Sequence, residues 1–133
     1  MNARETVEAI HRHYANRDLA AVMALMNDDI TLVSAGDPGS EIAVGSFEGR
    51  AAVAARLGGL SDIFEFERYQ TIQTVAELDW VAARVTVVLT VRETQERVKS
   101  ELAQFWLVHN GRASRWIEYF DTALAARVLP PMR

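Results

Sequence analysis

The chain has 133 residues, half of them hydrophobic and 24% charged, and it contains no cysteine. This composition is typical of a single globular domain over residues 1–133, and the absence of thiols excludes disulfides and thiolate metal sites. A net charge of −4 without a run of Lys or Arg argues against nucleic acid or a membrane as a partner. We expect a cytoplasmic protein, because the longest apolar stretch, 85–91, is too short for a membrane span and the N-terminus leaves no room for a signal peptide.

The first half of the chain combines helical periodicity with two short extended segments. Val7, Ile10 and Tyr14 recur at helical spacing, and Asp18 is placed to cap the next helix. The predicted elements are a helix at 4–16, a helix at 19–26, a strand at 30–34, a loop at 36–40, a strand at 42–47 and a third helix from Gly49. We expect the two glycines at 58–59 to weaken and end this third helix.

From about residue 63 onward the apolar period changes to two, which predicts β-strands. The strands are expected at 64–76, 80–94, 98–109 and 112–121, followed by a short helical tail at 124–129. Because tight turns join these strands, neighbours in the sequence must pair antiparallel. Helices followed by an antiparallel meander predict an α+β fold with helices on one face of the sheet.

The segment 102–123 carries two aromatic-rich strands around Asn110 and Gly111, which predicts a β-hairpin. We favour a three-residue loop, 109–111, over a two-residue loop that would shift the pairing by one residue. The favoured register pairs Gln104 with Trp116, and Leu102 with Glu118. One face of the hairpin then carries Leu102, Gln104, Trp106, Trp116, Glu118 and Phe120.

The opposite face of the hairpin is also apolar, with Phe105, Leu107, Ile117 and Tyr119. A single sheet in water does not expose two apolar faces, so one of them must receive the helices. The simplest cover for the other is a second copy of the chain, and we therefore expect a homodimer through the outer sheet face.

Glu118 is the main candidate for chemistry, because a carboxylate among apolar neighbours needs a partner. Arg84 and Thr86 share one face of their strand, and an Arg84 on the same side as Glu118 would bind it bidentately. The alternatives are an ion pair that holds the sheet to the helices, or an Arg84 that reaches the sheet edge. His11 and His13 lack the spacing of metal ligands and are interpreted as solvated, so we expect no metal and no cofactor.

Three segments of the chain resemble the nuclear transport factor 2-like superfamily, in the order expected for it. They are the paired N-terminal helices ending in MNDDITLV, then GSFEGRAAV, then FWLVHNGRASRWIEYFDTA. The superfamily includes ketosteroid isomerase, SnoaL-like polyketide cyclases and limonene-epoxide hydrolase. The resemblance implies a cone, in which a curved antiparallel sheet of four long strands plus short ones wraps three N-terminal helices around an apolar pocket. It also implies dimers through the outer sheet face.

The segment 116–121, Trp-Ile-Glu-Tyr-Phe-Asp, resembles Trp-Arg-Asp-Tyr-Phe-Asp of limonene-epoxide hydrolase. The resemblance implies that Glu118 occupies the position of the water-activating carboxylate, and that Arg84 matches the arginine of an Arg-x-Asp motif. Thr86 stands where the second aspartate is expected, and Leu32 and Ser34 replace a tyrosine and an asparagine. The residue set of that hydrolase is therefore incomplete.

The functional residues of ketosteroid isomerase match less well. Its oxyanion-hole tyrosine falls near Ile10, its general base near Ser34 and its protonated aspartate near Gln104. Steroid isomerisation is therefore not expected, although the amide of Gln104 retains a hydrogen-bond donor.

Two functions from different classes follow. The first is a pocket protein that binds a small, mostly apolar molecule with an oxygenated end. Its expected ligand contacts are Ser34, Thr86, Leu102, Gln104, Trp106, Trp116 and Phe120. The alternative is a hydrolase, isomerase or cyclase in which Glu118 is the general base and Arg84 the electrophilic partner.

Overall fold

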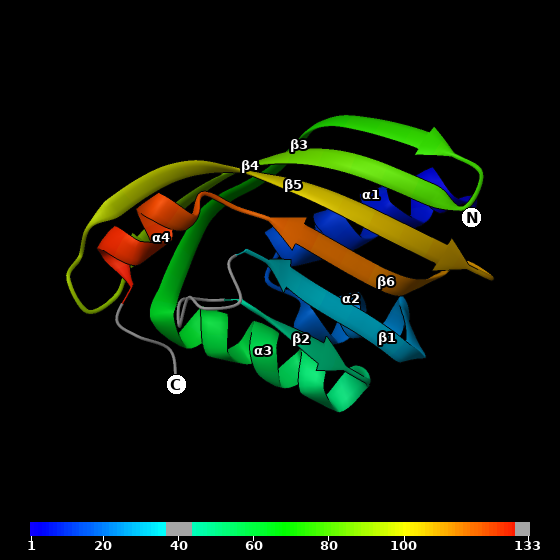
Figure 1. Ribbon diagram of the computed structural model, residues 1–133, viewed down its shortest axis with the longest axis horizontal. Helices are drawn as coiled ribbons and strands as arrows, with labels where there is room; N and C mark the ends of the chain where they lie inside the picture. Colours follow the sequence, from blue (N-terminus) through cyan, green and yellow to red (C-terminus); the bar gives the residue numbers. More distant parts are fainter. Residues whose placement is uncertain (37–43, 130–133) are drawn as a thin grey trace.

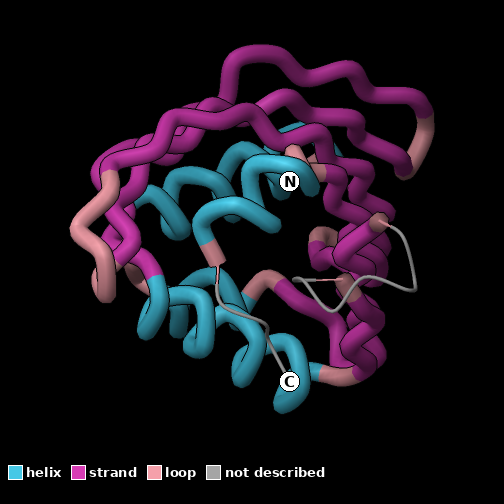
Figure 2. The backbone as a smooth tube through the Cα atoms, turned by 60° about the vertical axis from the view of Figure 1, so that its left-hand side comes forward, coloured by secondary structure: helices cyan, strands magenta, loops and turns pink. Residues whose placement is uncertain are grey.

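The computed structural model describes residues 1–36 and 44–129, in which a curved six-stranded sheet wraps around helices (Figure 1, Figure 2). The helices are α1 (Ala3–Ala15), α2 (Leu19–Ala24), α3 (Arg50–Ile63) and α4 (Thr122–Val128). The strands are β1 (Met26–Ala35), β2 (Gly45–Glu48), β3 (Phe64–Glu77), β4 (Trp80–Val91), β5 (Arg97–His109) and β6 (Arg112–Tyr119). The predicted α+β fold is confirmed.

The strand order is β2-β1-β6-β5-β4-β3. The sheet is mixed rather than purely antiparallel, because β1 pairs parallel with β6 while the other neighbours run antiparallel. Residues 42–43 of the predicted second strand and residues 37–40 of the predicted loop lie outside the described residues. Among the helices that the structure describes, none is both long and apolar enough to cross a membrane.

Local sequence explains where the N-terminal helices begin. Asn2 and Glu5 form a reciprocal capping box on α1, and the Asp18 side chain accepts from the Ala21 backbone N–H at the start of α2, as predicted. The third helix departs from the prediction, since α3 continues through the glycines at 58–59. Each glycine costs a helix about 0.5–1 kcal/mol. Val53 and Leu57 are almost fully buried on the same helix, and this packing outweighs the weak local propensity.

The hairpin between β5 and β6 has a two-residue turn, so the predicted three-residue loop is wrong. Asn110 (φ 52°) and Gly111 (φ 73°) are both left-handed, the geometry that this dipeptide favours, and His109 pairs with Arg112. The register then shifts, because Ser114 is an extra residue that forms a β-bulge. Turn and bulge together move the predicted pairing by two residues, so the same side chains still share a face.

Asn27 of β1 holds this bulge in place. Its side-chain amide donates to the Ser114 hydroxyl at 2.7 Å and to the backbone carbonyls of His109 and Arg112, both at 3.3 Å. The resulting register pairs Trp106 with Trp116 across the two strands.

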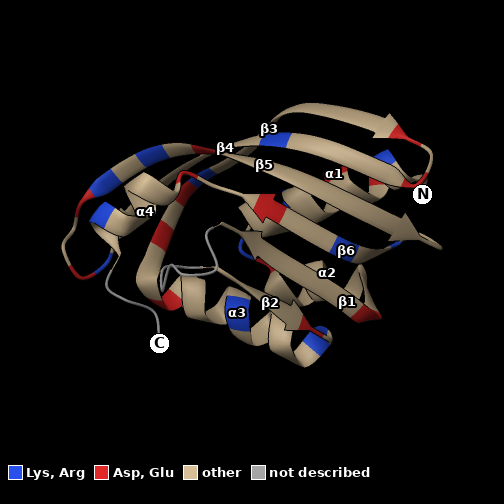
Figure 3. Ribbon diagram, viewed as in Figure 1, with Lys and Arg blue, Asp and Glu red and all other residues tan. Residues whose placement is uncertain are grey.

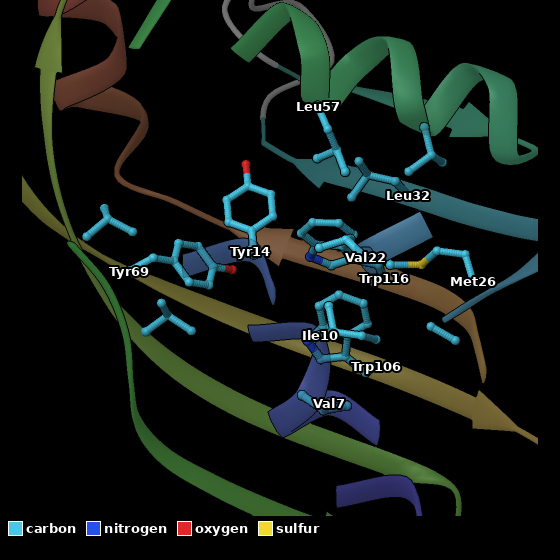
Figure 4. Close-up of a cluster of buried hydrophobic side chains, with 14 of the residues drawn as sticks. Val7, Ile10, Tyr14, Val22, Met26, Leu32, Leu57, Tyr69, Trp106 and Trp116 are labelled. Carbon is cyan, nitrogen blue, oxygen red and sulfur yellow. The ribbon is translucent and has the colours of Figure 1, made fainter. Parts of the chain in front are cut away.

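The core lies between the concave face of the sheet and the helices α1, α2 and α3 (Figure 4). Trp106 and Trp116 stack there with ring centroids 4.5 Å apart, and Ile10 of α1 is almost fully buried in the same cluster. The convex face is different, because Phe105 and Tyr119 remain 44% and 51% exposed. The charged residues of β5 lie near the turn that joins β4 to β5, and the stretch 102–108 of this strand has no charged residue (Figure 3).

Candidate functional site

A cavity of about 120 Å³ lies between the concave face of the sheet and the helices α1, α3 and α4. Its walls are mostly apolar, including Leu60 of α3, Phe66 of β3 and Leu124 of α4. The polar residues that line it are Tyr14, Ser34, Arg56, Tyr69, Ser100, Glu118 and Asp121. An apolar hollow with a few convergent polar groups is the usual form of a small-molecule site.

The structure divides the predicted site residues into three groups. Those that line the cavity are Ser34, Leu102, Trp116, Glu118 and Phe120. Gln104 and Trp106 lie behind the wall, both with 0% of their surface exposed. Arg84 and Thr86 lie on the convex face, away from the cavity.

The predicted pair between Arg84 and Glu118 is therefore wrong. The Arg84 guanidinium instead binds the carboxylate of Glu101 at 2.8 Å, and both side chains are about half exposed. The reason is the alternation of β4, since Val85 and Val87 are buried on the concave face and their neighbours point outward. Thr86 alternates with Val85 in the same way, so it does not line the cavity either.

Glu118 projects from β6 into the cavity, opposite Gln104 of β5. The Gln104 Nε2 donates to its carboxylate at 2.8 Å. Burial raises the pKa of Glu118, while the bond from Gln104, the nearby Trp116 and the Arg56 charge act in the opposite direction. The Trp116 indole N–H has no acceptor at hydrogen-bond distance among the described residues, although it lies near enough to favour the ionised carboxylate.

Gln104 is the centre of a buried hydrogen-bond network. Its Oε1 accepts from the Trp106 indole at 2.9 Å and contacts His11 Nε2 at 2.7 Å. Its Nε2 donates to the Tyr69 hydroxyl oxygen at 2.7 Å as well as to Glu118. All four hydrogen-bonding positions of the amide are therefore occupied.

The interpretation of His11 as a solvated residue is wrong. Only 3% of His11 is exposed, and its Nδ1 lies 2.7 Å from the Thr71 hydroxyl. Burial lowers its pKa to about 4, although the bond to Gln104 acts to raise it. The sequence did contain the signal, since His11 follows Val7 by four residues and precedes Tyr14 by three, which places it on the buried stripe of α1.

Three further residues at the cavity were not predicted as site residues. Arg56 of α3 stacks over the Phe47 ring with 5.0 Å to the centroid, and it lies near enough to Glu118 to affect the ionisation of both groups. Tyr14 and Tyr69 have raised pKa values, first through burial and then through the charge of Glu118. Among the described residues, no group of three His, Cys, Asp or Glu side chains could hold a metal ion.

Solved structures of similar fold cover nearly the whole chain. An NTF2-like protein of unknown function from Burkholderia pseudomallei has a TM-score of 0.85 at 22% identity, over 96% of this chain and 97% of that one. TerC, co-crystallised with polyporic acid, has a TM-score of 0.82 at 19% identity, over 95% and 96%. An LEH-like epoxide hydrolase from M. tuberculosis has a TM-score of 0.73 at 23% identity, over 96% and 88%.

At these identities the likeness establishes the fold and leaves the activity open. No curated protein sequence matches the chain. The SnoaL-like domain family matches residues 7–116, which include most of α1, the tryptophan pair and most of the cavity wall. The chain therefore belongs to the SnoaL-like domain family and has an NTF2-like cone fold.

Proposed function

We propose that the protein binds a small, mostly apolar molecule that carries one oxygenated group. The observation that carries this proposal is the apolar cavity of about 120 Å³ with a polar group of side chains around Glu118. An engineered cavity of about 150 Å³ in another protein binds benzene, so this volume corresponds to roughly one six-membered ring. TerC, one of the structural relatives, was co-crystallised with polyporic acid, which supports a small molecule as ligand.

The polar side chains favour a ligand hydroxyl or carbonyl. The Tyr69 oxygen accepts from Gln104, and its own O–H has no acceptor among the described residues. That hydrogen can be donated to a ligand oxygen, while the Glu118 carboxylate can accept from a ligand hydroxyl. Apolar walls and this donor–acceptor pair together match phenols, cyclic alcohols and cyclic ketones.

Filling the cavity tests the proposal. Ala125 of α4 lines the cavity, whereas the next residue, Ala126, is exposed. We expect Ala125→Phe to abolish the binding of phenol and cyclohexanone in calorimetry, and the matched control Ala126→Phe to bind as the parent does. Equal binding by both variants, or no binding of either probe by the parent at millimolar concentration, would contradict the proposal.

Catalysis is a second candidate, favoured by one observation. Glu118 lies at the cavity wall, and its raised pKa moves it toward the range in which a general base works near neutral pH. Because Arg84 is on the convex face, the electrophilic role falls to Tyr69 or Arg56. In this case Glu118→Gln should lose turnover while ligand affinity is retained, and unchanged turnover would exclude Glu118 as the base.

We also propose that a second copy of the chain covers the convex face. Phe105 and Tyr119 are exposed there as an edge-to-face pair with centroids 6.1 Å apart, next to a stretch of β5 without charges. Light scattering of the parent and of Phe105→Glu tests this, with a dimer expected for the parent and a monomer for the variant. A parent that is monomeric at micromolar concentration would exclude it.

A further inference from the structure

The orientation of the Gln104 amide is fixed by its neighbour Trp106. An indole N–H can only donate, so the Gln104 atom that lies 2.9 Å from it must be the carbonyl oxygen. The amide nitrogen consequently faces Tyr69 and Glu118. A flipped amide would direct its oxygen at the carboxylate and its N–H at the indole N–H, which are both repulsive.

The orientation of Gln104 in turn fixes the hydrogens of His11. Because the amide oxygen only accepts, His11 Nε2 at 2.7 Å must carry the hydrogen. The lowered pKa of His11 keeps the ring neutral at pH 7, so Nδ1 has no hydrogen and accepts from the Thr71 hydroxyl. Each donor in this row therefore points the same way, from Thr71 through His11 and Gln104 to Glu118.

We propose that this row is a directional hydrogen-bond chain that stabilises the ionised form of Glu118, with His11 as the positioning residue that maintains it. Hydrogen bonds arranged head to tail polarise one another, and donation to a carboxylate favours its charged state. The chain runs from partly exposed Thr71 on the edge strand β3, through the core, to the cavity. The role of this hydrogen-bond chain in ligand binding rests on the proposed function, whereas its effect on the ionisation of Glu118 does not.

The other groups facing Glu118 come from the elements packed around the cavity. Tyr14 of α1 and Tyr69 of β3 have raised pKa values and are neutral at pH 7. Arg56 of α3 also favours the carboxylate, so its effect adds to that of the chain. Asp121 lines the cavity but accepts from the Leu124 backbone N–H at the start of α4. Variants that change only the chain leave these groups in place.

Carboxyl NMR of the full-length protein, with ¹³C-labelled glutamate and no ligand, measures the Glu118 titration directly. The Glu118→Gln spectrum identifies the signal. We expect His11→Leu to raise the titration midpoint of Glu118 by about half a pH unit to one unit, because the variant loses the hydrogen bonds that polarise Gln104 and thereby favour the ionised carboxylate. His11→Gln retains an N–H directed at Gln104 and should return the midpoint toward that of the parent.

A milder change covers the case in which His11→Leu fails to fold. Thr71→Val keeps a β-branched side chain on the strand and removes only the first donor, so a smaller upward shift is expected. Thr74→Val is its matched control, because Thr74 lies on β3 outside the hydrogen-bond chain and, within the described part of the protein, its hydroxyl contacts Arg4 alone. A folded Thr71→Val with the parent's midpoint would overturn the proposal. Calorimetry with phenol tests the proposed function separately, so either one can fail without the other.

Discussion

Two polar pairs lie on opposite faces of the same curved sheet, and both have donor and acceptor 2.8 Å apart. Gln104 and Glu118 meet on the concave face, while Arg84 and Glu101 meet on the convex face. The first pair is enclosed by the core and the cavity, and the second is about half exposed. The surroundings of a hydrogen bond, more than its length, therefore decide how much the protein depends on it.

Loss of the concave pair should destabilise the protein most. Gln104→Leu leaves the Trp106 and His11 donors and the Glu118 carboxylate without their buried partner. We expect the free energy of unfolding to fall by about 3 kcal/mol or more, measured by urea denaturation. Gln73→Leu is the matched control, since the one side-chain hydrogen bond of Gln73 to residues 1–36 and 44–129 is an exposed contact of 3.4 Å with Arg84. Similar losses in both variants would contradict the difference between the faces.

The pH dependence of stability tests the same buried network. The pKa of His11 is about 4 in the folded chain against 6.5 for an ordinary histidine, so the unfolded chain binds the extra proton first as pH falls. The contribution of neutral, buried His11 to the free energy of unfolding is therefore complete above pH 6.5 and is lost by about pH 4. It amounts to roughly 3 kcal/mol. His11→Gln should flatten the decline across this window in urea titrations, whereas the half-buried His13→Gln should keep it. A parent-like slope in His11→Gln would show that His11 is not protected from protonation.

The smallest effect is expected on the convex face. Arg84→Met removes an ion pair that is exposed in the single chain, for which measured contributions are about 0–1 kcal/mol. Made in the Phe105→Glu variant, so that the proposed dimer does not cover the pair, the change should alter the free energy of unfolding by less than about 1 kcal/mol, and added salt should reduce the difference further. A loss above about 2 kcal/mol would mean that Arg84 does more than bind Glu101.

The sequence predicted which side chains share a face more reliably than it predicted partners. Alternation along β5 and β6 correctly placed Gln104 and Glu118 together, because the period of a strand is local. The partner of Arg84 depended on which face of β4 turns toward the helices, and alternation within one strand does not decide this. Arg56 was missed because its approach to Glu118 depends on how α3 packs on the sheet, which no local pattern encodes.

The bulge at Ser114 has a consequence for the whole of β6. If Ser114 instead paired with Leu107 in a regular ladder while the turn stayed intact, each side chain from Arg115 onward would exchange sides of the sheet. Tyr119 would then enter the hollow, and the acid at position 118 would be left in water. The face of the sheet on which Glu118 lies therefore depends on Ser114, about 10 Å or more away along the strand. The hydroxyl of Ser114 is held there by the side chain of Asn27.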